Sequence, residues 1–117
     1  MAQFKLGSEK RRPIASGGSP IYRKKLDKGI LGEANKDGSI HISKDIPKGS
    51  EMEKRVINHE TQHAKDMAKG KLDYGDDYVR YNSKTYPRKD GEIKYNGKWY
   101  EEGDDRLPWE KAAYKKT

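Results

Sequence analysis

The sequence contains no cysteine and a single phenylalanine, and hydrophobic residues make up only 31% of its 117 residues. Without cysteine the chain can form no disulfide, and any zinc site has to use histidine and carboxylate ligands. No apolar run approaches the roughly 18 residues that a membrane-spanning helix needs, and the N-terminus lacks the apolar core of a signal peptide. We therefore expect one domain with a small core, no membrane partner, and export only by lysis or packaging into a particle.

Charge is abundant and unevenly distributed. Charged residues make up 38% of the sequence, and the net charge is +7. Residues 1–28 carry eight basic and two acidic side chains, a net +6, whereas residues 29–117 carry eighteen basic and seventeen acidic ones, a net +1. The first segment has too few apolar residues for a core of its own. We interpret it as a basic arm, either a disordered tail or a segment that orders against an acidic partner, and residues 29–117 as the domain.

The most informative stretch is His59-Glu60-Thr61-Gln62-His63, an H-E-x-x-H pattern. If it is helical, the two histidines lie one turn apart on one face, and both imidazoles reach the same metal ion. Glu60 lies beside them, where it can take a proton from a metal-bound water. Two of the chain's three histidines fall in this one turn. We therefore favour a zinc site over a solvated helix with two surface histidines.

The flanking residues predict that this stretch is helical. Ser50 followed by Glu53 is typical of a capping box, and Gly70 is a common helix terminator. Between these ends, apolar residues recur at a spacing of three to four. We expect a helix over residues 51–69 with one side on the core.

Two short strands are expected before the helix, over residues 30–34 and 39–43, with a turn at residues 35–38. The isoleucines of the second strand share one face and leave His41 on the other. This order suits a hydrolase, because a strand beside the helix can hold an extended peptide.

After the helix, residues 71–77 are predicted to form a polar connection to a short internal repeat. Residues 80–86 match residues 94–100, fourteen positions later. Asn-Gly within a tyrosine-rich run is a strong hairpin signal, and Asn-Ser is a weaker version of it. We expect two β-hairpins whose aromatic side chains pack in the core.

A catalytic zinc needs three protein ligands and an open position for water. Pro108 suits the first turn of a C-terminal helix, and Glu110 on that helix is our preferred third ligand. Asp66 is an alternative, although its place on the histidine helix better suits a supporting role that orients a histidine or a backbone group. His41 is another, although a strand residue there more often lines a substrate cleft. The last alternative is the acidic cluster of Asp73, Asp76 and Asp77.

Residues 59–66 and 108–114 together resemble the zincin metallopeptidases of the gluzincin kind. In those proteins the third ligand is a glutamate on a later helix, in a glutamate-x-x-alanine setting. The chain is especially similar to the very small zincin-like proteins of bacteria and phages. The resemblance implies an α+β fold with a minimal zincin-like domain, and hydrolysis of a peptide or another amide bond. The residues that it implies are His59, His63 and Glu110 as zinc ligands and Glu60 as general base and proton shuttle.

Three classes of function remain open. The first is a zinc-dependent metallopeptidase, or a related amidase, acting on a peptide or cell-wall substrate. The second is a structural component of a virion or assembly, in which zinc staples two helices and catalysis is vestigial. The third is a basic nucleic-acid-binding protein, which explains residues 1–28 but not the histidine pair. Glu60 favours the enzyme, because a structural site needs no base. We expect the arm to dock on another protein or an assembly, in the cytoplasm or in a phage virion.

Overall fold

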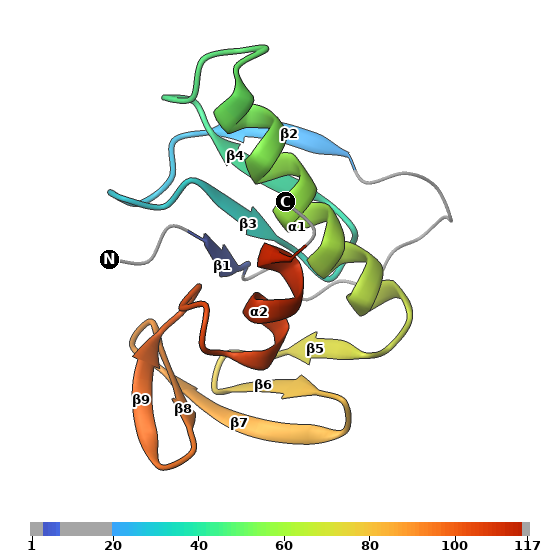
Figure 1. The fold of residues 1–117 in the computed structure, drawn as a ribbon, viewed down its shortest axis with the longest axis vertical. Helices are drawn as coiled ribbons and strands as arrows, with labels where there is room; N and C mark the ends of the chain where they lie inside the picture. The colour runs from blue at the N-terminus through green and yellow to red at the C-terminus, as the bar shows by residue number, and fades with distance from the viewer. Residues whose placement is uncertain (1–3, 8–19, 116–117) are drawn as a thin grey trace.

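The computed structural model describes residues 4–7 and 20–115, and in this part of the chain the fold is α+β (Figure 1). The strands of a first sheet are β1 (Phe4–Leu6), β2 (Ile21–Lys24), β3 (Gly32–Ala34) and β4 (Ile40–Ser43). Those of a second sheet are β5 (Leu72–Tyr74), β6 (Tyr78–Tyr81), β7 (Lys84–Lys89), β8 (Glu92–Tyr95) and β9 (Lys98–Glu101). The helices are α1 (Glu51–Ala68) and α2 (Pro108–Tyr114).

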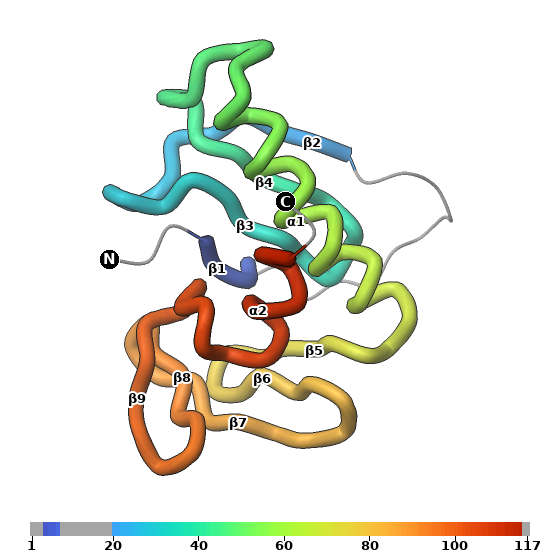
Figure 2. The backbone as a smooth tube through the Cα atoms, in the orientation of Figure 1, coloured from blue at the N-terminus to red at the C-terminus, as the bar shows by residue number. Residues whose placement is uncertain are grey.

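The helices join the two sheets. The first sheet has the strand order β1-β3-β4-β2, and α1 packs across β3 and β4 (Figure 1). The second sheet is an antiparallel meander in chain order, and α2 lies between it and α1, as the backbone path in Figure 2 shows. Neither helix in the described ranges is long and apolar enough to cross a membrane.

Two apolar clusters form the core, and β1 contributes to both. Phe4 belongs to the cluster between the first sheet and α1, whose other buried members are isoleucines of the β4 region and Val56. Leu6, two residues later, belongs to the cluster between α2 and the second sheet, which includes Trp109. This short strand therefore packs into both halves of the molecule.

The predicted helix over residues 51–69 is confirmed, and so are its two end signals. Ser50 Oγ accepts a hydrogen bond from the Glu53 N–H at 3.1 Å, which satisfies one of the free amides at the start of α1. Gly70 has a φ of +77°, and the N–H of Lys71 donates to the Asp66 carbonyl at 2.9 Å. This is the closing pattern of a Schellman motif, so local sequence sets both ends of the helix that carries the histidines.

We expect Ser50→Ala to lower the free energy of unfolding by about 1 kcal/mol, because the Glu53 amide loses its acceptor. Chemical denaturation followed by circular dichroism measures the change. Ser50→Asp is the control, since its carboxylate can still cap the helix. Equal losses in the two variants would contradict the capping role.

The predicted hairpins are confirmed, and one expected loop is a strand. The last three turns of the meander each place two residues at positive φ: Asn82 and Ser83 (50° and 69°), Asp90 and Gly91 (52° and 76°), and Asn96 and Gly97 (51° and 79°). These values suit the right-handed twist of the strands. The predicted polar connection at residues 71–77 is wrong, because β5 pairs with β6 there. Leu72 and Tyr74 are buried on either side of Asp73. This apolar alternation covers only three residues and has polar neighbours, so it did not indicate a strand.

Within residues 1–28, the described residues include two strands of the first sheet, β1 and β2. β1 pairs in parallel with β3, and β2 pairs in parallel with β4. An edge strand needs few apolar residues, because backbone hydrogen bonds to its neighbour stabilise it. The first sheet therefore contains strands from both sides of residue 28. The basic run Lys10–Arg12 lies outside the described residues.

Candidate metal centre

Three predicted site residues converge where α1 meets α2. His59 Nε2 lies 2.8 Å and His63 Nε2 lies 3.1 Å from the same oxygen, Glu110 Oε1. The i, i+4 spacing places both imidazoles on one face of α1, with 4.9 Å between ring centroids. All three side chains are at most 1% exposed. Two imidazole nitrogens and one carboxylate oxygen from separate helices therefore meet at one buried point.

Packing of α2 determines which way Glu110 faces. Trp109 is fully buried and lies against Tyr81 and Tyr86 of the second sheet, with ring centroids 6.0 and 5.4 Å away. Successive helical residues are about 100° apart around the axis, so when Trp109 faces the sheet its neighbour faces α1. The hydrogen bonds from His59 and His63 show that Glu110 does so. The aromatic core of the hairpins thus positions the acidic residue of the site.

Glu60 lies beside the histidines and is fully buried. Neither carboxyl oxygen has a hydrogen-bond partner in the described part of the chain. Gly32 of β3 makes room for it, because a Cβ there would lie only 2.7 Å from Glu60 Oε2. Burial, reinforced by the negative charges of Glu110 and Glu33, raises the pKa of Glu60 well above its usual value. The sheet therefore holds an unpaired carboxyl group against the site.

The charges of the site fit a bound cation. Burial opposes ionisation of Glu110, but the charge of His63 and hydrogen bonds from both histidines lower its pKa to about 2. Burial lowers the pKa of His59 and favours its neutral form, which is the form that binds metals. Ligand atoms of His59, Glu60 and His63 all lie within 4.8 Å of one another. Buried carboxylates need a compensating positive charge, and this group has the donor atoms to hold a metal ion that supplies it.

Three of the other candidate ligands, Asp66, His41 and Asp73, make contacts outside this group. Asp66 Oδ1 accepts a hydrogen bond from Gln62 at 3.1 Å, and the Nδ1 atoms of both histidines have no partner among the described residues. No hydrogen bond therefore supports the expected orienting role of Asp66. His41 lies on the outer face of β4, with Nδ1 at 3.1 Å from Glu33 Oε1. Asp73 of the acidic cluster forms an ion pair with a lysine at 2.9 Å.

Two aromatic residues complete the surroundings of His59, and neither was among the predicted site residues. The Phe4 ring stacks on the His59 ring, with 3.9 Å between centroids and 17° between planes, and Tyr114 meets His59 edge-on at 4.7 Å. Burial, followed by the charge of Glu110, raises the pKa of Tyr114 to about 12. Tyr114 was detectable, because it follows Glu110 by one helical turn. Phe4 carried no such signal, since it is a lone aromatic in a polar segment.

Comparisons with known proteins identify no relative: no family model, no curated protein and no solved structure matches this chain. The likeness to gluzincins therefore rests on residues 59–66 and 108–114 alone.

Proposed function

We propose that this protein is a zinc-dependent hydrolase, a minimal zincin-like metallopeptidase that cleaves a peptide or another amide bond. The observation that carries the proposal is the convergence of His59 Nε2 and His63 Nε2 on Glu110 Oε1, with the unpaired carboxyl group of Glu60 beside them. Two histidines and a glutamate are a common ligand set of catalytic zinc, and the adjacent carboxylate is the base that such a site requires. We place the protein in the cytoplasm or in a phage virion.

In the proposed mechanism three residues bind the metal and a fourth transfers the proton. His59, His63 and Glu110 would hold the metal, and zinc there would supply Lewis acidity toward a substrate carbonyl and a water molecule. Glu60 accepts a proton from the attacking water and returns it to the leaving nitrogen. Its carboxyl oxygens are suited to this transfer because no hydrogen bond from the described residues engages them.

The purified protein is expected to contain about one zinc per chain, and His59→Ala or His63→Ala should abolish binding, because each removes one of three ligands. Elemental analysis of protein purified without chelators measures the content. His41→Ala is the matched control, since this histidine lies on the outer face of the first sheet. Protein that contains no zinc and takes none up on dialysis would contradict the proposal.

A structural zinc site is the second candidate, and one observation favours it. His59, Glu60 and His63 are completely buried, and Glu110 is 1% exposed. Burial from solvent suits a structural role, in which zinc would link α1 to α2 and contribute directly to folding. The two candidates share their ligands and differ at Glu60, which only the hydrolase needs.

A further inference from the structure

A catalytic role requires the closed site to open. A substrate has to come within hydrogen-bond distance of the general base, and Glu60 is fully buried. Two clefts lie beside β1, and neither is lined by Glu60 or by the three proposed ligands. An element that covers the site must therefore move before a peptide can reach it.

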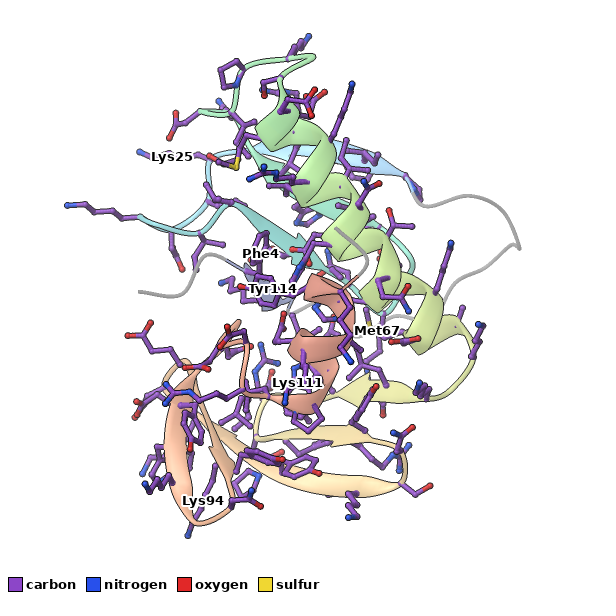
Figure 3. All side chains as sticks on the ribbon, viewed as in Figure 1. Phe4, Lys25, Met67, Lys94, Lys111 and Tyr114 are labelled. Carbon is purple, nitrogen blue, oxygen red and sulfur yellow. The ribbon has the colours of Figure 1, made fainter. Side chains whose placement is uncertain are left out.

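The side chain of Phe4, in β1, covers one face of His59. Its ring stacks on His59 at 3.9 Å and meets Tyr114 edge-on at 5.7 Å. Figure 3 shows Phe4 and Tyr114 next to each other where β1 meets the end of α2. Removing Phe4 would uncover one face of a proposed metal ligand.

β1 lies in a slot between β3 and Gly103, in the position that a bound extended peptide would take. It is the outermost strand of its sheet and pairs with β3, with Phe4 opposite Gly32. Gly32 is the residue in close contact with Glu60, so this sheet edge passes directly beside the proposed base. On the opposite side, Gly103 permits close approach, because a Cβ there would collide with the Phe4 carbonyl oxygen. Addition of a strand to a sheet edge is a general mode of peptide binding.

The outer flank of β1 borders two clefts. A cleft of about 220 Å³ separates Leu6 and Gly7 from residues 90–91 at the start of β8. Lys5 also borders a second cleft of about 580 Å³. Arg88 Nη2 donates a hydrogen bond to the Leu6 carbonyl at 2.9 Å, so a side chain holds this flank, not a further strand.

We propose that the slot occupied by Phe4–Leu6 is the substrate-binding site, and that this segment is an exchangeable occupant which a substrate peptide replaces. The proposal rests on the proposed function, because it assigns the substrate position of the same metal centre. It also reconciles the buried site with catalysis, since the protein closes its own centre until a peptide displaces β1.

The occupant indicates the class of substrate. Phe4 and Leu6 are buried in the two apolar clusters, while Lys5 points to the other face of the sheet. Lys5 Nζ lies 3.1 Å from Glu33 Oε2 and 3.5 Å from Asp27 Oδ2. The slot therefore suits an extended peptide with a basic residue between two apolar ones.

The first test measures how readily a chelator removes zinc from the full-length, zinc-loaded protein. Phe4→Ala should accelerate zinc transfer to 4-(2-pyridylazo)resorcinol by at least about tenfold, because it weakens the cover over His59. Ile46→Ala is the control, since Ile46 is buried in the same cluster but lies outside β1. Both variants are compared at the same interval below their melting temperatures. Equal acceleration would mean that zinc escapes through general unfolding, and would overturn the proposal.

The second test adds a peptide that can occupy the slot in place of β1. A synthetic peptide with the sequence of residues 1–8 should slow zinc release from the Phe4→Ala protein, whereas a scrambled peptide should not. Failure of both peptides to slow release would show that the slot does not exchange its occupant.

Hydrogen exchange measures in the unmodified protein whether β1 leaves its slot. This measurement is possible even if a variant does not fold or no zinc binds. The amides of residues 5–7 should exchange by local opening, faster than those of β4. Exchange of both segments only through global unfolding would make β1 a permanent strand. Absence of zinc would overturn the proposed function, and with it the assignment of the slot to a substrate. Hydrogen exchange of the metal-free protein would still show whether β1 opens locally.

Discussion

Glu60→Gln is expected to lower turnover by at least about a hundredfold while zinc content and melting temperature stay close to those of the unmodified protein. Glutamine keeps the size of the side chain but cannot take up the proton of the attacking water. The carboxyl group of Glu60 makes no hydrogen bond to the described residues, so the substitution breaks none of them. It also leaves His59, His63 and Glu110 in place.

The measurement compares zinc-loaded proteins at equal concentration on mixed peptides and on peptidoglycan fragments. Glu51→Gln is the matched control, because it makes the same change of charge at an exposed position of the same helix. Its turnover should equal that of the unmodified protein. Equal turnover in Glu60→Gln would remove the proposed mechanism and leave the structural zinc site as the better account.

The helices were predictable because their signals are local. Ser50, Gly70 and Pro108 act within one turn of the helix ends that they define, and each lies where the sequence places it. The hairpins were predictable for the same reason, since Asn96 and Gly97 adopt the positive φ values that their turn requires.

The candidate site was predictable only in part. The i, i+4 spacing brings His59 and His63 together without any knowledge of the fold. Glu110 lies 51 residues beyond His59, so no local rule joins them. It was preferred because it lies on a second predicted helix, and the resemblance to gluzincins implies the same residue. The contact of Gly32 with Glu60 depends on the position of β3 against α1, which no pattern in either segment encodes.

The N-terminal strands could not be predicted from composition. Phe4 and Leu6 stand in a strongly basic segment and show one apolar alternation, too short to indicate a strand. Their burial arises from pairing with β3, which lies more than 25 residues away in sequence. Such pairing depends on the rest of the sheet, and a low apolar content does not exclude it.

Glu110→Gln is expected to weaken zinc binding and to destabilise the fold together. Its carboxylate accepts hydrogen bonds from both histidines and carries the negative charge that a dication requires. Loss of a residue that only supports a ligand costs about 10- to 100-fold in metal affinity, so loss of a ligand's charge should cost more than about a hundredfold. The metal-free protein should lose about 1–3 kcal/mol of stability, because glutamine is a weaker acceptor in the link between α1 and α2.

Competition with a chelator of known affinity gives the zinc dissociation constant, and denaturation of the metal-free protein gives the stability. Glu102→Gln is the matched control, since Glu102 is also buried and ion-paired, at 2.9 Å from Arg88, but lies away from the histidines. The control should lose comparable stability and keep its zinc affinity. Unchanged zinc affinity in Glu110→Gln would mean that Asp66 or His41, and not Glu110, is the third ligand. His41 is paired with Glu33 at 3.1 Å, so its use as a ligand would also require the first sheet to rearrange when zinc binds.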